Sequence, residues 1–153
     1  MPSPLTVRSV TSDEHRAFVT SASGSFLQTP AWGAVKADWA NVGLGWFDGS
    51  TLVGTALVLL RQTPKVKRYL AYVPEGPVID WKRFDVTDIT TPLLAELRRR
   101  KAFSVKLGPQ VVARRWTAAT LKAAISDGSA GRIGDVPPDY LDEAAAALTH
   151  GLS

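Results

Sequence analysis

The segment at residues 44–60 constrains the fold more than any other part of this chain. Two apolar runs in it flank Asp48-Gly49, a pair that favours a tight turn between antiparallel strands. The second run is apolar at almost every position from Val53 to Leu60, so it offers hydrophobic side chains on both faces. The two runs are Leu44–Phe47 and Thr51–Leu60. We therefore expect a hairpin whose second strand lies inside a sheet that is covered on both sides.

Two short helices are expected before this hairpin. Thr11 and Glu14 have the three-residue spacing of a capping box, which predicts a helix that ends near residues 21–25. Thr29 followed by Pro30 is typical of the start of a second helix. The apolar residues that indicate inner faces are Phe18 and Val19 in the first helix and Ala31, Trp32, Val35 and Trp39 in the second.

After the hairpin, strand patterns alternate with helical ones. Residues 69–73 and 103–107 are typical of strands that proline and glycine terminate, and apolar residues four apart (Ile89, Leu93, Leu97) predict a helix over 88–101. The other expected helices are Trp116–Asp127, with Gly128 as its C-cap, and an alanine-rich helix that starts at 137–139 and includes Tyr140, Ala144 and Leu148. Helices must then cover a mostly antiparallel sheet, which is an α/β (α+β) design.

The composition excludes several classes of site. The chain of 153 residues has no cysteine, which rules out disulfides, thiolate nucleophiles and cysteine-ligated metals. Its two histidines, His15 and His150, are too few for a multi-histidine metal site. The N-terminal sequence does not resemble a signal peptide, and the run at 53–60 is far shorter than the ~20 residues that span a bilayer. We expect a soluble, cytoplasmic protein with one domain over residues 1–153 and no metal.

Common motifs for phosphate binding and acyl transfer are also missing. The chain has no Gly-x-x-x-x-Gly-Lys phosphate loop and no Gly-x-Ser-x-Gly nucleophile elbow. Gly43-x-Gly45 lacks the third glycine of a dinucleotide fingerprint, because Asp48 stands at that position. The loop with which acetyltransferases cradle coenzyme A is absent as well. Four common enzyme classes therefore lose their usual sequence support.

Positive charge is concentrated in the middle of the chain. Residues 61–115 hold thirteen Lys and Arg against five Asp and Glu, whereas both flanking segments are slightly negative. A field of this sign suits a phosphate-bearing partner. Solvated edges and helix ends also explain the charge without a ligand. The run at 98–101, for example, closes a predicted helix at the end where the helix dipole favours cations.

The first candidate binding segment is FLQTPAWGAVK at residues 26–36. Lys36 follows Trp32 by four residues, so it lies on the aromatic side of the predicted helix. A lysine in that position can lean into a cleft and meet a phosphate as a point charge. It can equally extend its stem over Trp32 or Trp39 at the surface, with no ligand involved.

The second candidate segment is YLAYVPEGPVID at residues 69–80, which runs from a strand into a loop stiffened by proline. Loops of this kind position binding groups at the end of a sheet. A tight structural turn with Tyr72 in the core is the alternative. Glu75 and Asp80 are candidate general bases, although nothing in the sequence distinguishes them from solvated loop carboxylates.

These two segments, in this order and about thirty-five residues apart, resemble the FemA/FemB/FemX family of aminoacyl-tRNA-dependent peptidyltransferases, which build the peptide bridge of bacterial peptidoglycan. The resemblance continues through FSVKLGP to GDVPPDY and covers nearly the whole chain. It implies a GNAT-like domain, with a mixed, mostly antiparallel sheet flanked by helices. It also implies that residues 1–153 form most of the first of two such domains.

The resemblance further implies a reaction in which a stem-peptide amine attacks the ester carbonyl of an aminoacyl-tRNA. The acceptor would be lipid II or UDP-MurNAc-peptide, with Lys36 on the precursor phosphates and Tyr72, Gly76 and Pro77 lining the same cleft. We expect no cofactor, because an ester is already activated toward an amine. Aminoacyl-tRNA would be the partner of the full-length protein. Peripheral contact with the inner membrane face and self-association through an exposed apolar face are also expected.

Two departures from the family pattern limit these expectations. The strand-end pattern Lys-x-Asp-Pro reads Lys106-Leu-Gly108-Pro109 here, so no base role carries over to that position and the catalytic residue stays unknown. Family members are well over twice as long, so we expect this chain alone to be inactive in transfer. The alternatives are a non-catalytic binding module of acetyltransferase-like fold and an acyl-CoA-dependent N-acetyltransferase, which the missing coenzyme A loop disfavours.

Overall fold

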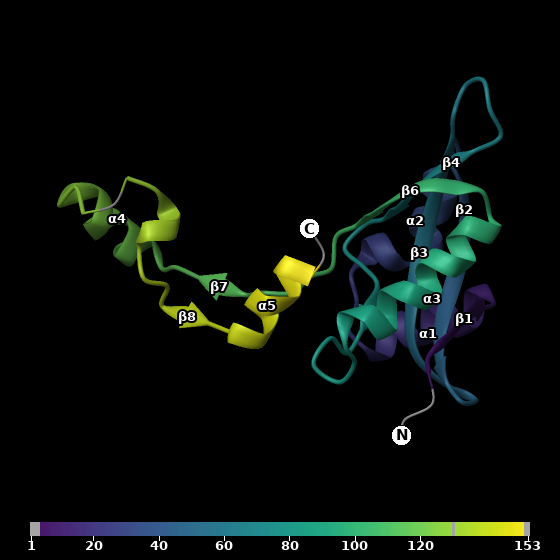
Figure 1. The fold of residues 1–153 in the computed structure, drawn as a ribbon, viewed down its shortest axis with the longest axis horizontal. Helices are drawn as coiled ribbons and strands as arrows, with labels where there is room; N and C mark the ends of the chain where they lie inside the picture. The colour runs from purple at the N-terminus through teal and green to yellow at the C-terminus, as the bar shows by residue number, and fades with distance from the viewer. Residues whose placement is uncertain (1–3, 130, 152–153) are drawn as a thin grey trace. The chain divides into compact units, whose positions relative to one another are not determined.

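The chain divides into two compact units, residues 1–110 and residues 111–153 (Figure 1). The structure is a computed structural model that describes residues 4–129 and 131–151, and in the last helix it describes side chains as far as residue 147. Each unit is described by itself, and the expectation of one domain over residues 1–153 stays a prediction. Within the described ranges, no helix is long and apolar enough to cross a membrane.

The predicted hairpin forms the centre of the first unit. Strand β2 (Ala40–Asp48) and strand β3 (Thr51–Gln62) pair in antiparallel register. Gly49 in the turn has a φ of +61°, a left-handed conformation that glycine adopts without a steric penalty. Residues 55–60 of β3 are all buried, which confirms that this strand is central and covered on both faces.

The sheet around this hairpin is mixed and mostly antiparallel. Its strands follow the order β1-β2-β3-β4-β6, and β5 also pairs with β3. All pairs are antiparallel except β4 with β6. The remaining strands are β1 (Thr6–Ser9), β4 (Tyr69–Val73), β5 (Val78–Ile79) and β6 (Ala102–Leu107). The predicted fold class, a mixed, mostly antiparallel sheet flanked by helices, is confirmed, although the short strands β1 and β5 were not expected.

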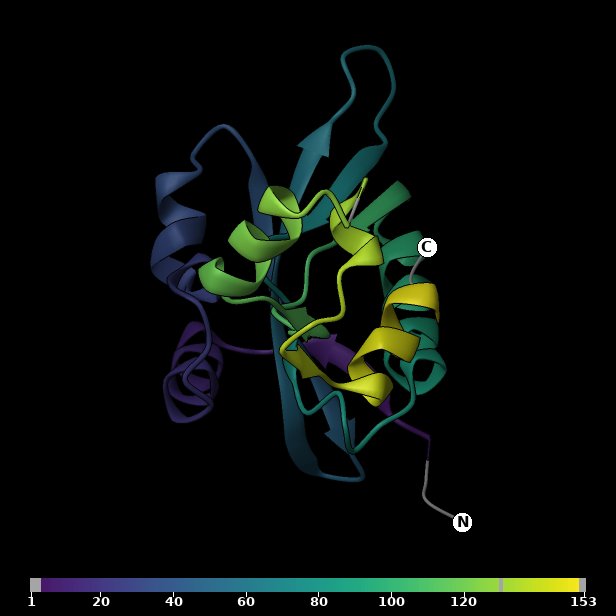
Figure 2. The same ribbon diagram turned by 90° about the vertical axis from the view of Figure 1, so that its left-hand side faces the viewer.

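Helices cover the two faces of this sheet (Figure 2). Helix α3 (Val86–Arg99) lies on one face and buries Ile89, Leu93 and Leu97, as their spacing predicts. The indole Nε1 of Trp46 donates a hydrogen bond of 2.8 Å to the Ile89 carbonyl oxygen, which links the sheet to this helix. The other face carries α1 (Ser12–Ser21), the 3₁₀ turn η1 (Phe26–Gln28) and α2 (Pro30–Val35).

The predicted starts of α1 and α2 are confirmed, but the predicted inner face of α2 is not. Thr11 and Glu14 form the capping box of α1, and hydrogen bonds from Thr11 hold the pKa of Glu14 below its usual value. Helix α2 ends at Val35, which is exposed, and its buried residue is Gly33. A Cβ atom at Gly33 would lie 2.9 Å from Oδ1 of Asn41, so glycine lets this helix approach the sheet closely.

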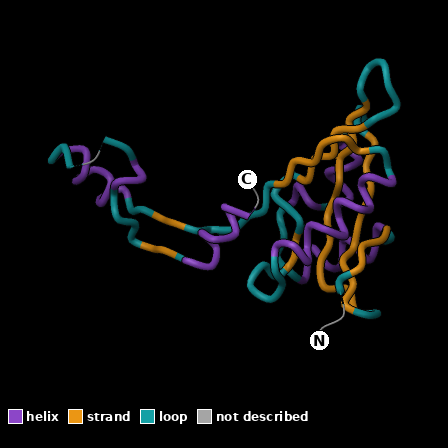
Figure 3. The backbone as a smooth tube through the Cα atoms, viewed as in Figure 1, coloured by secondary structure: helices purple, strands orange, loops and turns teal. Residues whose placement is uncertain are grey.

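The second unit pairs two short strands with two helices (Figure 3). Its elements are β7 (Arg114–Arg115), α4 (Ala118–Ser126), η2 (Ile133–Asp135), β8 (Tyr140–Leu141) and α5 (Glu143–Gly151). The predicted start of the last helix at 137–139 is wrong, because Tyr140 pairs with Arg115 in the β7–β8 ladder. Among the described side chains of α5, the buried one is that of Ala145 rather than that of Ala144, and the side chain of Leu148 lies outside the described residues.

Candidate functional site at the exits of β4 and β6

Strands β4 and β6 end at the same edge of the sheet. They are parallel, and their last residues, Val73 and Leu107, are paired. Loops that leave the carboxyl ends of neighbouring parallel strands bring their side chains together, and ligands commonly bind there. We call this region the strand-exit site. It comprises Ser25, Gln28, Tyr72, Glu75, Gly76, Pro77, Lys106, Gly108 and Gln110.

Gln28 forms the buried floor of the strand-exit site. Its side chain is fully buried in η1, and its Oε1 accepts a hydrogen bond of 2.9 Å from the backbone N–H of Leu57. Its Nε2 donates to the carbonyl oxygens of Pro74 at 2.5 Å and of Leu57 at 3.4 Å. On the side of β3 away from β2, neither β4 nor β5 pairs with Leu57. The side-chain amide of Gln28 bonds to the Leu57 backbone there, in place of a neighbouring strand.

Gly76 lies directly against this amide. A Cβ atom at Gly76 would lie 2.4 Å from Cδ of Gln28, so another residue here requires Gln28 to move. Both Gly76 and Pro77 are buried, and the peptide bond between them is cis. Packing on Gln28 therefore accounts for a glycine at this position. The binding role that the family resemblance implies for Gly76 and Pro77 stays a prediction.

Glu75 is the carboxylate of the strand-exit site. It is half-buried, and one oxygen, Oε2, accepts hydrogen bonds from Ser25 Oγ and from Gln110 Nε2, the latter at 3.1 Å. No described residue donates to Oε1. The backbone φ of Glu75 is +49°, a region that non-glycine residues rarely adopt, and such strain tends to occur at functional sites. Asp80, in contrast, is exposed and accepts from Lys82 N–H in a local turn.

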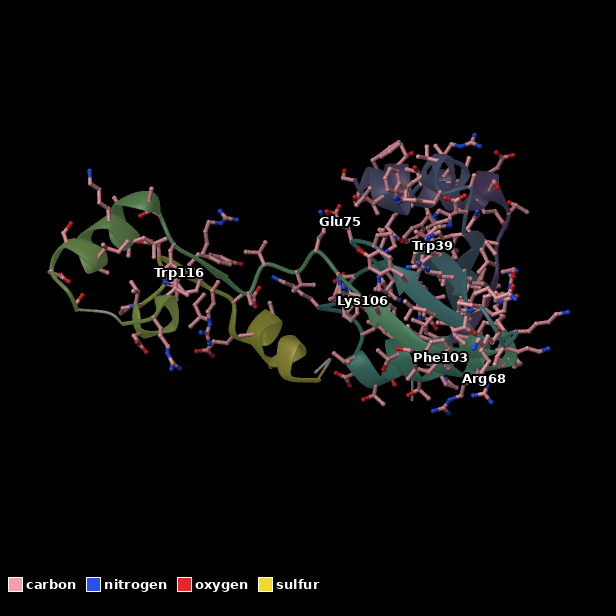
Figure 4. All side chains as sticks on the ribbon, turned by 90° about the horizontal axis from the view of Figure 1, so that it is seen from above. Trp39, Arg68, Glu75, Phe103, Lys106 and Trp116 are labelled. Atoms are coloured by element: carbon pink, nitrogen blue, oxygen red, sulfur yellow. The ribbon has the colours of Figure 1, made fainter. Side chains whose placement is uncertain are left out.

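A lysine and a tyrosine on adjacent strands form the exposed side of the site. Tyr72 of β4 is paired with Lys106 of β6, and the Lys106 Nζ atom lies 5.6 Å from the centre of the Tyr72 ring. Tyr72 is half-buried, so its side chain is not enclosed in the hydrophobic core. Figure 4 labels Lys106 and Glu75 at this end of the sheet. The arrangement offers a cation, an aromatic ring and a carboxylate at one edge.

Lys36 belongs to the same face of the sheet as Tyr72. It is the C-cap of α2, whose Gly33 lies against the Leu57 side chain, so α2 covers the face to which Leu57 points. Side chains alternate along a strand, and Leu59, which shares that face, is paired with Tyr72. The Lys36 Nζ atom lies 4.8 Å from the centre of the Trp32 ring. Contact of Lys36 with a precursor phosphate stays a prediction.

A buried histidine supports the floor of the site from α1. His15 Nε2 donates a hydrogen bond of 2.5 Å to the backbone carbonyl oxygen of Gln28. Nδ1 of His15 is buried and has no partner among the described residues. Burial lowers the pKa of His15 below its usual value, although the bond to Gln28 opposes this shift. The neutral ring is thus the form that the structure accommodates.

Sequence reasoning missed the residues that hold the site together. His15, Ser25, Gln28 and Gln110 carry no local pattern that predicts their roles, because each partner lies far away in the chain. Gln28 stands in the FLQTPAW segment between an apolar residue and a helix cap, where a solvated amide is equally expected. In the described ranges, no group of three or more His, Cys, Asp or Glu residues could hold a metal ion.

Comparison with known proteins first defines the fold class. A crystal structure of FemX matches this chain with a TM-score of 0.60 and 24% sequence identity, over 80% of this chain and 31% of that one. The chain therefore has the fold of a FemX domain. The Brucella melitensis ribosomal-protein-alanine N-acetyltransferase covers 92% of this chain at a TM-score of 0.48 and 11% identity.

Sequence relatives and a family model then give the family. Lipid II:glycine glycyltransferases of Staphylococcus aureus strains MRSA252 and N315 are 29% identical to this chain over 112 residues, which is 67% of this chain and 25% of each relative. The chain spans about a quarter of the length of these relatives. The FemAB family model matches residues 10–129. This chain belongs to the FemAB family.

Proposed function

We propose that this chain is the precursor-binding part of an enzyme that builds peptidoglycan bridges. Its ligand is lipid II or the UDP-linked soluble precursor, held at the strand-exit site and by Lys36. Relatives that are 29% identical are lipid II:glycine glycyltransferases, which supports this acceptor class. The observation that carries the proposal is the meeting of Tyr72, Glu75 and Lys106 at the ends of two parallel strands in a FemAB chain.

Transfer itself is proposed for a full-length protein that contains these residues. A stem-peptide amine attacks the carbonyl carbon of an aminoacyl-tRNA ester, a C–N bond forms, and the ester C–O bond breaks. The nitrogen gives up a proton, and the released tRNA hydroxyl takes one up. A cytoplasmic location follows from this donor, because aminoacyl-tRNA is a cytoplasmic molecule. Self-association of this chain stays a separate prediction.

Glu75 is our candidate for the group that accepts the amine proton. Its Oε2 is fixed by two donors while Oε1 has no partner among the described residues, so one oxygen is held and the other is available. The family pattern has an acidic residue where this chain has Gly108. A Cβ atom at Gly108 would lie 3.7 Å from the Glu75 backbone nitrogen, so Glu75 is next to the position where that carboxylate is missing.

Isothermal titration calorimetry of the 153-residue chain with UDP-MurNAc-pentapeptide tests precursor binding. We expect Lys36→Ala and Lys106→Ala each to weaken binding about tenfold and to flatten its salt dependence, because each removes a charge-assisted contact to phosphate. Lys122→Ala, an exposed lysine of the second unit, is the matched control and leaves the affinity unchanged. Unchanged affinity in Lys36→Ala or Lys106→Ala removes that residue from the site.

Three further results would separate the proposed function from its alternatives. The glycine at position 108 favours a second candidate, a binding module that has lost chemistry, and detection of amide formation from an aminoacyl-tRNA donor would exclude it. No binding of the precursor by the wild-type chain would contradict the main proposal. Saturable binding of coenzyme A would point instead to an acyl-CoA-dependent N-acetyltransferase.

A further inference from the structure

A basic hollow lies on the first unit between the β3–β4 loop and the turn from α3 to β6. Its volume is about 450 Å³. Its lining residues are Val66, Lys67, Arg68, Arg98, Lys101 and Ala102. The backbone N–H of Tyr69 donates a hydrogen bond of 3.1 Å to the Lys101 carbonyl oxygen, which holds the two segments together. Four of the six lining residues are cations, and none is acidic.

The charges of the basic hollow are not neutralised by the protein. Glu96, the nearby carboxylate of α3, is already bonded to Arg99 and Arg100, which do not line the hollow. In the described part of the chain, no carboxylate forms an ion pair with any of the four lining cations. The dipole of α3 favours Arg98 and Lys101 at its carboxyl end, but it gives no reason for Lys67 and Arg68 in the loop.

An exposed apolar side chain lines the same hollow. Val66 is 57% exposed. The loop that carries Val66 projects beyond the sheet (Figure 1, between β3 and β4). Hydrogen bonds to the Val66 carbonyl oxygen from Thr63 Oγ1 at 2.6 Å and from Arg68 N–H at 2.7 Å fix the loop. Val66 is therefore presented to solvent by an ordered loop.

We propose that the basic hollow and Val66 form a docking surface for an anionic lipid bilayer. Lipid phosphates would occupy the hollow among the four cations, while Val66 enters the headgroup region. Clustered Lys and Arg next to an exposed apolar side chain are the combination that binds such a surface. An RNA backbone would use the cations but offers no apolar layer for Val66, so the pairing of the two features favours lipid.

This surface adds a membrane contact to the proposed function, and it does not depend on transfer chemistry. It lies at the opposite end of β4 from the strand-exit site, because it adjoins Tyr69, the first residue of β4, whereas the exit site follows Val73, the last. A protein docked there would leave the exit site open to a soluble ligand such as the UDP-linked precursor. Vesicle binding can be measured with neither donor nor acceptor present.

Vesicle co-sedimentation of the 153-residue chain tests the proposal. We expect binding to vesicles of three parts phosphatidylcholine to one part phosphatidylglycerol, and little binding to pure phosphatidylcholine. Lys67→Gln with Arg68→Gln should lower the partition coefficient about 25-fold, at about fivefold for each cation. The matched control, Arg16→Gln with Lys122→Gln, removes the same charge from exposed positions elsewhere and should lower it less than about twofold.

A second variant separates a lipid surface from other phosphate ligands. Val66→Ser keeps every charge, and it should weaken vesicle binding while leaving inorganic phosphate binding unchanged. Equal losses in the test and control pairs would overturn the proposal, as would equal binding to both vesicle types. Vesicle binding that resists Lys67→Gln with Arg68→Gln, combined with loss of binding to a short RNA duplex, would assign the hollow to RNA. Circular dichroism melting verifies that each variant is folded.

Discussion

The side-chain amide of Gln28 donates a hydrogen bond of 2.5 Å to the carbonyl oxygen of Pro74, 46 residues later in the chain. The same amide accepts from the Leu57 backbone at 2.9 Å. One buried side chain thus connects the turn η1 to the central strand and to the point where β4 ends. The position of Glu75, directly after Pro74, depends on this connection.

Replacing Gln28 by leucine should destabilise the protein by about 3 kcal/mol, because it leaves buried backbone groups of Leu57 and Pro74 without partners. Urea unfolding followed by circular dichroism measures the loss. Gln62→Leu, at the exposed end of β3, is the control and should change the unfolding free energy by less than about 0.5 kcal/mol. Similar losses in the two variants would show that the Gln28 bonds contribute little.

Gly76→Ala should cost about 1–3 kcal/mol, because the added methyl group overlaps the Gln28 amide. Gly134→Ala is a suitable comparison, since a Cβ atom there meets nothing within 4 Å. The double variant Gln28→Ala with Gly76→Ala tests the cause, because shortening residue 28 relieves the overlap. The cost of Gly76→Ala should then largely disappear, and purely additive costs would point to a different origin.

The stability of the protein should fall as the pH drops from about 7 to about 5, and His15 should contribute to this fall. Burial lowers the pKa of folded His15 below its usual value of 6.5, so on acidification the unfolded chain binds a proton that the folded chain does not. The contribution is fully present above pH 6.5 and is lost below it, with a slope of at most about 1.4 kcal/mol per pH unit.

Unfolding free energies of the wild type and of His15→Gln across this pH range measure the effect. The variant should show a shallower slope, and His150 is common to both proteins, so it cancels in the comparison. Identical slopes would mean that folding does not lower the pKa of His15.

Glu75→Gly should separate stability from chemistry. The variant loses the hydrogen bonds from Ser25 and Gln110 but relieves a φ of +49°, so the unfolding free energy should change by less than about 1 kcal/mol. In a full-length protein that contains these residues, aminoacyl transfer should fall at least about 100-fold, as expected when a general base is removed. Transfer at the wild-type rate would exclude Glu75 as the proton acceptor.

Features that depend on neighbouring residues were predicted well. The Asp48-Gly49 turn, the capping box of Thr11 and the buried stripe of α3 all follow from backbone preferences or from side-chain periodicity within a few residues. The strand at 69–73 also ends where Pro74 predicts it to end. The predicted start of the last helix is wrong, because a proline pair indicated a helix start, whereas Tyr140 pairs with Arg115 in a short strand ladder.

The sequence by itself determined the central hairpin, most helix starts and the family, since each rests on patterns within short segments of the chain. Only the tertiary structure decided that β4 runs parallel to β6, that Gln28 and His15 are buried, and that Glu75 meets Gln110. It also joined Lys67 and Arg68 of one loop to Arg98 and Lys101 of another segment in one hollow. Such pairings join residues distant in the chain, and no local propensity encodes which distant partner a side chain will meet.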